Sequence, residues 1–564
     1  MLQPFKIRMT RGWHLQTLWG KQQTHTDHQK TFPWKHYPAA EESASTLQQL
    51  VPCFTMTFNL TVTLLSGERA DVEVDPDRTV IFLRRAAESQ LKRPLKALLS
   101  AQGRLNGPSR ICDAGLQDGD VITAIVREPG PVMESYRKAR AFAAIKEDTV
   151  VTWGASEFGG DSRSVRRQLT DVMQVYVSEF ACAAIRNDGT VVSWGSAIAG
   201  GDSHDVRNKL IDVKEIVAAN SAFAATKSDG SVVAWGDSRN GGSCEEVQKE
   251  LFDVQKIFAS NTAFAAIRGD GKVVTWGAKN GGGDSQAVQS QLLDVKQIHS
   301  TSVAFAAVRQ DGSVVSWGAV SGGGDCSGQE LTDVVQMHST TRAFAALQAD
   351  GKVVTWGAPS AGGDSRSVRD NLLDVVQLCA SEAAFAAIKA DGSVVVWGSS
   401  DSGGDASGHS EVLRGGVRQL VATDSAFAAI KDDASVVTWG AKRAIHGCAE
   451  LMDVQQVVPN EGAFAAIKSD GSVVTWGDPA CGGDSSEVQA ELVNVHRIHA
   501  ASGAFAAVRH DGKVISWGDP RGGGNSRDVS EYLNSEGFAS STSPDNNPKQ
   551  HGVSENIQLP SIQE

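Results

Sequence analysis

The sequence predicts a mainly β protein, with an array of ten repeats of about 41 residues and three strands each, preceded by a small α+β domain. Two observations predict this fold class. From Trp153 to Trp517 the dipeptide Trp-Gly occurs ten times at spacings of 37 to 42 residues. Residues 56–126 instead show a hairpin, a helix and further strands. A repeat of this size cannot bury its own faces, so its neighbours must supply the core.

Ten of the 13 tryptophans occupy the same position of the repeat. These are Trp153, Trp194, Trp235, Trp276, Trp317, Trp356, Trp397, Trp439, Trp476 and Trp517. One large ring at the same strand position of every unit suits a repeated core, because each ring can bury roughly 150–250 Å². A stacking platform for bases or sugars is the weaker interpretation of the ten rings.

Residues 253–293 represent one unit. The runs DVQKIFAS, AFAAI and KVVTWG predict three short antiparallel strands, the last two joined by Asp270-Gly271. Asp-Gly between two β-prone runs favours a type I′ hairpin, whose two central residues need positive φ. The segment GGDSQAVQSQL, residues 282–292, predicts about two helical turns, with Asp284 accepting from the first free N–H groups.

The run AFAAIKSDGSVVTWG, residues 463–477, resembles the signature of the regulator-of-chromosome-condensation repeat family. The resemblance implies a β-propeller-like array over residues 132–533, with one blade per unit. The units are shorter than that family's blades and are similar to the compact three-stranded blades of a bacterial β-lactamase inhibitor protein. Ten units also exceed the roughly 4–8 blades of most propellers. One ring of ten, a smaller ring with extra units and an open spiral all agree with the sequence.

Residues 55–128 have their own pattern. FNLTVTLLSGERADVEV is an alternating hairpin with Ser66-Gly67 at its turn, and a helix is expected to begin near Thr79. LLSAQGRL and AGLQDGDVITAIV then supply the last strands. This β-β-α-β-β order is similar to the ubiquitin-like (β-grasp) fold. After Val126 the chain continues as REPGP instead of ending in Gly-Gly, so the segment resembles a built-in docking domain.

In the ubiquitin-like family a surface apolar patch is recognised by ubiquitin receptors. The matching positions are Leu65 beside the hairpin turn, Leu98 or Leu99, and Ile125 on the last strand. An interpretation of equal weight is that these residues only fill the core. The first interpretation implies protein partners such as ubiquitin receptors or ligase components.

Composition argues against several partners and environments. Lys and Arg total 53 against 66 Asp and Glu, a formal net charge of −13, so no broad basic field is available for nucleic acid or anionic lipid. No apolar run reaches the roughly 20 residues of a membrane span, and a secretory signal is not expected. The eight cysteines include no CxxC pair. We interpret them as reduced thiols of a cytoplasmic or nuclear protein.

The two ends of the chain are expected to lie outside folded domains. Residues 1–54 hold four histidines whose spacing fits no zinc signature, and we predict a mobile extension. Residues 534–564 are polar and rich in Pro and Asn, as in SSTSPDNNPKQHG, which predicts a disordered tail.

No catalytic, cofactor or metal site is expected. The GGD carboxylates recur once per unit, whereas a calcium ion needs about six or more oxygens converging on one site, so helix capping is the better interpretation. Gly-Gly-Asp-Ser lacks the lysine and the spacing of a phosphate-binding loop. Ser, His and Asp occupy variable positions of different units, so no triad can be assigned. We expect no enzyme activity, no cofactor and no small-molecule ligand.

Recognition is expected where the units differ. The two to five residues after each Trp-Gly vary most, and loops on a rigid frame commonly carry recognition. In the eighth unit GAKRAIHGCAEL replaces the GGDS segment and adds Lys442, Arg443 and His446. We predict a partner contact at these three residues, with sequence drift as an alternative of equal weight.

The sequence therefore predicts a non-catalytic interaction scaffold that links the array to ubiquitin-pathway partners. Two alternatives follow from the resemblances. Ubiquitin ligases of the HECT type carry similar arrays, which would make the chain a substrate-recognition component. The founding member of the repeat family promotes guanine-nucleotide exchange on a small GTPase, but the acidic balance here argues against its chromatin binding.

Overall fold

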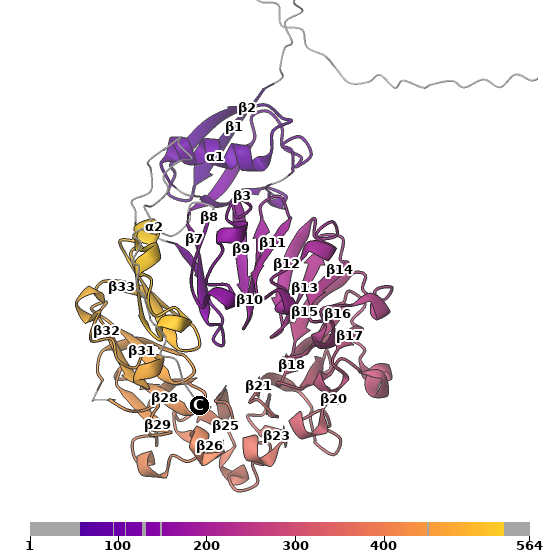
Figure 1. Cartoon of the computed structure of the whole chain (residues 1–564). Helices are drawn as coiled ribbons and strands as arrows, with labels where there is room; N and C mark the ends of the chain where they lie inside the picture. Colours follow the sequence, from indigo (N-terminus) through magenta and orange to yellow (C-terminus); the bar gives the residue numbers. More distant parts are fainter. Residues whose placement is uncertain are drawn as a thin grey trace, which may run out of the picture. The chain divides into compact units, whose positions relative to one another are not determined.

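The computed structural model describes residues 57–534, except Pro94, Asn106, Pro108, 127–130, 147–148 and 448–450. The extension expected at residues 1–54 and the tail expected at residues 534–564 lie outside the described residues, except for Asn534. The described chain contains one five-stranded sheet and ten three-stranded antiparallel sheets (Figure 1). The prediction of a mainly β protein with three-stranded repeats is confirmed.

The five-stranded sheet belongs to a small α+β domain and has the strand order β2-β1-β5-β3-β4. Its elements are β1 (Phe58–Leu64), β2 (Arg69–Val74), α1 (Val80–Leu91), β3 (Leu95–Ser100), β4 (Gly103–Arg104) and β5 (Val121–Val126). Strands β1 and β5 are parallel, and the other neighbours are antiparallel. Alternate residues of β1, namely Leu60, Val62 and Leu64, share one core with Val80 and Leu83 of α1. The period of two therefore decides which face of the sheet the helix covers.

Each repeat forms one sheet from three consecutive strands, with the second strand in the middle. The first strands are β6 (Val132–Glu134), β9 (Val172–Val177), β12 (Val213–Ala218), β15 (Val254–Ala259), β18 (Val295–Ser300), β21 (Val334–Ser339), β24 (Val375–Ala380), β27 (Val417–Ala422), β30 (Val454–Pro459) and β33 (Val495–Ala500). The middle strands are β7 (Ala141–Lys146), β10 (Ala181–Arg186), β13 (Ala222–Lys227), β16 (Ala263–Arg268), β19 (Ala304–Arg309), β22 (Ala343–Gln348), β25 (Ala384–Lys389), β28 (Ala426–Lys431), β31 (Ala463–Lys468) and β34 (Ala504–Arg509). The third strands are β8 (Thr149–Gly154), β11 (Val191–Gly195), β14 (Val232–Gly236), β17 (Val273–Gly277), β20 (Val314–Gly318), β23 (Val353–Gly357), β26 (Val394–Gly398), β29 (Val436–Gly440), β32 (Val473–Gly477) and β35 (Val514–Gly518).

The middle strands carry small side chains because both of their faces are covered. In β13, the residues 222–225 are completely buried. Phe223 stacks on its cross-strand partner Trp235, with ring centroids 5.2 Å apart. Nine repeats contain this Phe–Trp stack. In the second repeat Cys182 takes the place of the phenylalanine opposite Trp194.

The Asp-Gly hairpins differ from the predicted type I′ turn. In the third repeat Gly230 has a φ of +77°, while Asp229 keeps a negative φ. Gly230 N donates to Lys227 O at 3.0 Å, and Lys227 N donates to Ser231 O at 2.9 Å. This pattern is a type I turn followed by a left-handed glycine, which forms a G1 bulge. In the eighth repeat Ala434 adopts the glycine's conformation, with a φ of +63°.

The segments after Trp-Gly form short 3-10 helices. The two helical turns predicted in residues 282–292 are present as the six-residue 3-10 helix Gln286–Gln291, and the equivalent helices of the other described repeats are three residues long. The first set comprises η1 (Ser156–Phe158), η3 (Ala197–Ala199), η5 (Ser238–Asn240), η7 (Lys279–Gly281), η9 (Val320–Gly322), η10 (Pro359–Ala361), η12 (Ser400–Ser402), η14 (Pro479–Cys481) and η16 (Pro520–Gly522). The second set comprises η2 (Arg163–Val165), η4 (His204–Val206), η6 (Glu245–Val247), η8 (Gln286–Gln291), η11 (Arg369–Asn371), η13 (Ser407–His409), η15 (Gln489–Glu491) and η17 (Arg527–Val529), before the short helix α2 (Ser530–Asn534). Glycines and short polar side chains disfavour a longer helix here. Asp284 Oδ1 nevertheless accepts from Gln286 N at 3.0 Å, as a capping carboxylate does.

The first and last repeats pack against each other. Phe142 of β7 shares one core with Ala504 and Val508 of β34. Ser502 N also donates a hydrogen bond of 2.8 Å to Ala139 O. Figure 1 shows the sheets following one another in sequence order until the last stands beside the first. Of the three arrangements compatible with the sequence, the structure has the closed cycle.

Candidate functional site

One end of every sheet carries two kinds of loop. The middle strand begins where the antiparallel third strand ends, as the pairing of Ala222 with Gly236 shows. The turn that precedes the middle strand therefore lies beside the turn that follows Trp-Gly. We call this end of the array the loop face, since the variable residues of the repeats gather there.

Two glycines shape each loop of this face. In the third repeat Gly236 has a φ of +107°, and a Cβ there would lie 2.7 Å from Ser221 O. Gly241 has a φ of +92°, and its Cβ would lie 2.6 Å from the ring of Phe264 in the next repeat. Only glycine fits both positions, so the glycine excess determines how closely consecutive repeats approach.

The repeat tryptophans join neighbouring repeats and offer no stacking platform. Each of the ten is at most 4 % exposed. In nine repeats the indole Nε1 donates to a glycine carbonyl of the adjacent repeat, as Trp276 does to Gly241 O at 3.1 Å. Trp476 differs, because its buried Nε1 has no hydrogen-bond partner among the described residues. The eighth repeat, which precedes it, lacks the GGDS segment that supplies this carbonyl elsewhere.

The turns between first and middle strands are joined by backbone hydrogen bonds, and we call them the linked turns. In each, one N–H donates to the C=O of the equivalent residue in the next repeat at 2.8–3.3 Å. The described chain of bonds runs through Asn220, Asn261, Ser302, Thr341, Glu382, Asp424, Glu461, Ser502 and Ala139. The linked turns thus connect the third repeat to the tenth and close onto the first.

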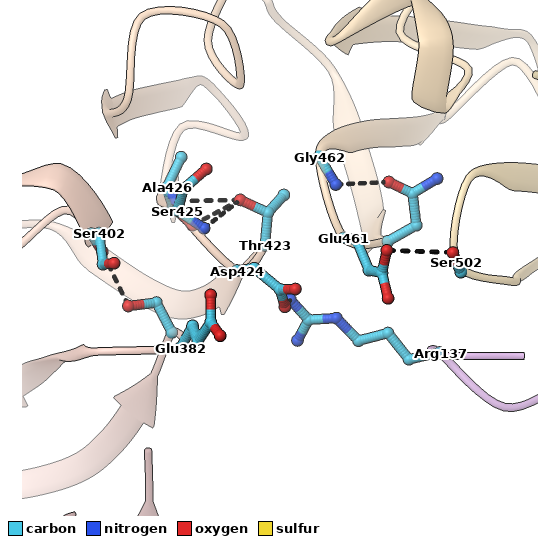
Figure 2. Close-up of polar contacts among 12 residues, drawn as sticks. Arg137, Glu382, Ser402, Thr423, Asp424, Ser425, Ala426, Glu461, Gly462 and Ser502 are labelled. Carbon is cyan, nitrogen blue, oxygen red and sulfur yellow. Dashed lines mark hydrogen bonds and ion pairs between the residues drawn. The ribbon is translucent and has the colours of Figure 1, made fainter. Parts of the chain in front are cut away.

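In the fourth to ninth repeats a polar residue before the linked position holds the turn in shape. Thr423 Oγ1 accepts from Ser425 N at 3.3 Å and from Ala426 N at 2.9 Å (Figure 2). Asn460 Oδ1 accepts from Gly462 N at 3.0 Å in the same way. Thr423 and Asn460 are completely buried. Because these polar side chains are satisfied inside the protein, the loop face is a preorganised surface.

Arg137 of the first repeat crosses to the eighth repeat. Its Nη2 lies 2.6 Å from Asp424 Oδ1 (Figure 2), and the two side chains are 35 % and 29 % exposed. Burial raises the pKa of the neighbouring Glu461 carboxyl. The hydrogen bond that Ser502 Oγ donates to Glu461 at 3.0 Å opposes this rise in pKa, and the Asp424 charge adds to it. Sequence reasoning missed Arg137 because it lies outside the repeated signature.

A pocket of about 330 Å³ lies where the last repeat meets the first. Its lining includes Arg140, Glu157, Phe158, Glu461, Asp519 and Arg521. The Arg140 guanidinium carbon lies 5.7 Å from the Phe158 ring centroid. Acidic side chains outnumber basic ones in this lining, so the pocket does not favour an anion.

A larger pocket, of about 590 Å³, lies beside the linked turns of the fourth to seventh repeats. Its lining includes Lys138, Asn261, Asn280, Ser302, Arg342 and Glu382. Lys138 comes from the first repeat, directly after Arg137. Asn280 lies in η7, one of the variable turns after Trp-Gly. The pocket therefore combines the linked turns with the loops in which the sequence predicts recognition.

The three residues predicted in the eighth repeat lie in the loop after its Trp-Gly pair. Arg443 Nε lies 2.5 Å from Asp478 Oδ2 of the ninth repeat. The His446 carbonyl accepts from Gly477 N at 2.8 Å. Lys442 is exposed. The loop thus packs on the ninth repeat through Arg443 and His446, which assigns these two residues a structural contact.

Two of the four predicted apolar residues of the small domain are neighbours on the sheet. Leu64 pairs with Ala124 across β1 and β5, so the residues that follow them, Leu65 and Ile125, come next to each other. Leu65 is 89 % exposed and Ile125 is 37 % exposed. Ile125 lies on the face opposite the core, because its strand neighbour Ala124 belongs to the core, and Leu65 lies in the turn that follows β1.

Leu98 and Leu99 of β3 point to opposite faces. Leu99 pairs with Thr123 and therefore shares the outer face with Ile125, and it is partly exposed. Leu98 is 2 % exposed and belongs to the core. The ambiguity between the two positions is resolved in favour of Leu99, and Leu98 is a core residue.

The described ranges contain no trio of His, Cys, Asp or Glu side chains arranged to hold a metal ion. Among the described helices, none has the length and apolar character needed to cross a bilayer. Six cysteines lie in the described part of the chain, and all six are free thiols.

No family model matches the sequence. No curated protein matches it either. Solved structures match parts of it. Yeast RCC1 (Prp20), solved bound to Kap60, is 15% identical, with 40% of this chain and 70% of that chain covered and a TM-score of 0.28. The CRINKLY WD40 ectodomain of the Arabidopsis thaliana receptor kinase ACR4 is 15% identical over 45% and 90% of the two chains, with a TM-score of 0.26. Human WBSCR16 is 14% identical over 60% and 87%, with a TM-score of 0.27. The sequence identities and TM-scores are too low to establish a shared family or activity.

Proposed function

We propose that the chain is a non-catalytic interaction protein of the cytoplasm or nucleus. Its propeller-type array presents the loop face to protein partners, and its ubiquitin-like domain docks to proteins of the ubiquitin pathway. The observation that carries the proposal is that Leu99 and Ile125 share the outer face of the five-stranded sheet, with the exposed Leu65 in the turn that follows β1. Exposed apolar side chains grouped on one face mark interaction sites more often than single ones do.

The strand order β2-β1-β5-β3-β4 with one helix on the core face supports the ubiquitin-like assignment. In that fold the apolar patch lies on the face of the sheet opposite the helix, and the positions of Leu99 and Ile125 support the proposal. The array contributes a rigid frame whose variable residues gather on one end. A substrate-recognition component of a ubiquitin ligase would use the same two surfaces and is the alternative function.

A binding measurement tests the docking role. The probe is a fluorescent peptide of a ubiquitin-interacting motif, titrated with the full chain and followed by fluorescence anisotropy. Leu65→Ala and Ile125→Ala are each expected to weaken binding about tenfold, since truncating an apolar anchor costs roughly 1–2 kcal/mol. Ile211→Ala is the matched control, because Ile211 is 47 % exposed in the array. Absence of binding, or equal affinity in all variants, would end the ubiquitin-pathway proposal.

A further inference from the structure

The linked turns divide into an acidic part and an uncharged part. The seventh to ninth repeats place carboxylates there, namely Glu382, Asp424 and Glu461. The third to sixth repeats place amides and hydroxyls there, namely Asn220, Asn261, Ser302 and Thr341. An anion near this face is therefore repelled from one part and tolerated by the other.

The first repeat contributes two consecutive cations, Arg137 and Lys138, to the loop face. Arg137 is neutralised by Asp424 at 2.6 Å. Lys138 instead lines the larger pocket and is partly buried. Its ammonium makes no ion pair with any described residue. The Glu461 charge interacts with Lys138 without forming an ion pair, and Glu382 lines the same pocket. A partly buried cation that forms no ion pair carries a desolvation cost that an anionic ligand would offset.

Arg342 supplies a second cation to the same pocket. It follows Thr341 of the linked turn, and its backbone N–H donates to Thr340 Oγ1 at 3.4 Å. The guanidinium likewise has no ion pair within the described residues. Arg342 is exposed. The lining thus holds two cations and one carboxylate, Glu382, beside amide and hydroxyl side chains, so it is positive on balance in a chain whose formal net charge is −13.

We propose that this pocket binds a phosphate monoester carried by a protein segment. The phosphate oxygens accept hydrogen bonds from Lys138 Nζ and the Arg342 guanidinium, and the Asn261 and Asn280 amides complete the shell. A phosphate carries close to two negative charges near pH 7 and suits two cations. The inference specifies a partner for the loop face, so it rests on the proposed binding role of the array.

The pocket favours a peptide over a nucleotide as the carrier. None of its lining residues is aromatic, and its apolar lining is limited to Val303 and Ala319, whereas a base is usually held by stacking or apolar contact. The volume of about 590 Å³ exceeds what a phosphate group alone needs. Glu382 also lines the pocket and would repel a free phosphate, but it can accept from a backbone N–H or a basic side chain beside the phosphorylated residue.

The test is a calorimetric titration of the full chain with four probes. These are acetyl-Gly-phosphoserine-Gly-amide, its unphosphorylated counterpart, inorganic phosphate and adenosine monophosphate. We expect the phosphopeptide to bind most tightly and the unphosphorylated peptide not to bind. Lys138→Ala and Arg342→Ala are each expected to weaken phosphopeptide binding about tenfold, the loss typical of one charge-assisted hydrogen bond.

Two further variants keep the result interpretable. Lys249→Ala removes an exposed lysine distant in sequence from the pocket residues and should leave the affinity unchanged. Glu382→Gln should strengthen the binding of inorganic phosphate, because it removes the repelling charge. Equal affinity of the original chain and the two cation variants would overturn the site. Inorganic phosphate or the nucleotide binding as tightly as the phosphopeptide would overturn the protein carrier. Neither result depends on Leu65 or Ile125, so failure here is distinguishable from failure of the docking role.

Discussion

Trp153 Nε1 donates a hydrogen bond of 3.0 Å to the carbonyl oxygen of Gly523, 370 residues further along the chain. The bond has the same form as the one from Trp276 to Gly241 O between consecutive repeats, which measures 3.1 Å. The interface that closes the cycle is thus of the same kind as the internal interfaces. A closed cycle needs no terminal repeat with a polar outer face, which open repeat arrays require for solubility.

Replacing a repeat tryptophan by phenylalanine should cost less in the ninth repeat than in the fourth. Trp276→Phe leaves the Gly241 carbonyl without its buried donor, which costs about 1–3 kcal/mol beyond the lost contacts. Trp476→Phe removes an N–H that has no partner among the described residues. Differential scanning calorimetry should show a larger drop in Tm for Trp276→Phe, and equal drops would contradict the hydrogen-bond argument.

Ala434→Gly should stabilise the eighth repeat by about 1 kcal/mol, because the left-handed conformation costs alanine roughly 1–2 kcal/mol. Part of that gain is offset by the larger freedom of glycine in the unfolded chain. The reverse change, Gly471→Ala, should destabilise the ninth repeat, since Gly471 has a φ of +76°. Native-state hydrogen exchange of the amides of β28, β29, β31 and β32 measures both effects. Unchanged exchange in either variant would count against this assignment.

Stability should fall as the pH drops from about 6.5 to about 4. Burial lowers the pKa of His299 and of His499 to about 4, and nearby positive charges add to the effect. The unfolded chain binds protons at these histidines near pH 6.5 while the folded chain does not, so the free energy of unfolding decreases through this window. Above about pH 6.5 His299 and His499 do not change the free energy of unfolding.

The slope of the free energy of unfolding against pH tests whether His299 and His499 cause this loss of stability. Urea unfolding measured at several pH values should show a shallower dependence for the variants His299→Gln and His499→Gln. The turn aspartates with lowered pKa, such as Asp311, begin to contribute only near their ordinary value of 3.8. A pH dependence that is identical in the variants would show that the two histidines are not its source.

The ion pair of Arg137 and Asp424 should contribute at most about 1 kcal/mol, because both side chains are about a third exposed. A double-mutant cycle of Arg137→Ala and Asp424→Ala, evaluated by urea unfolding, measures the coupling. The coupling energy should be favourable at low salt and shrink as salt is added. A coupling of zero at low salt would show that the pair is not formed in solution.

The repeated parts of the fold could be predicted because they obey periodic rules. The strand positions followed from β-prone runs and from Trp-Gly spacing, and the Phe223–Trp235 stack follows from a cross-strand register of twelve residues. The two helical turns predicted in residues 282–292 are confirmed as the 3-10 helix Gln286–Gln291. The equivalent helices of the other described repeats are only three residues long, since a segment with glycines at its start gains little from extending a helix. The hairpin type was also wrong, because Asp-Gly fits a G1 bulge as well as a type I′ turn.

One missed backbone feature did have a signal. In the second to tenth repeats the residue before the first strand is left-handed, with φ values such as +55° at Asp212 and +54° at Asn494. Asp recurs there, with Asn494 in the tenth repeat and Gly416 in the eighth, and these residue types tolerate that conformation best.

The loop face was only partly predictable. Variation after Trp-Gly predicts recognition at this end, which stays a prediction, and Asn280 of one such turn lines the larger pocket. No sequence pattern predicted the positions of Arg137 and Lys138, because these residues lie outside the repeated signature. Both lie beside repeats that are distant in sequence. Leu98 and Leu99 could not be separated until the pairing of Leu99 with Thr123 fixed the register of β3. A single non-repeated contact depends on the three-dimensional arrangement, which periodicity does not encode.

Every three-stranded sheet is built from consecutive strands, and none combines strands from the two ends of the array. Side-chain packing and single hydrogen bonds, such as those at Trp153 and Ser502, are therefore what joins the ends. The strand pairings would therefore be the same whichever repeat came first in the chain. A circular permutant opened between any two repeats would keep all of its strand pairings, and only the one-off contacts would mark which repeat comes first.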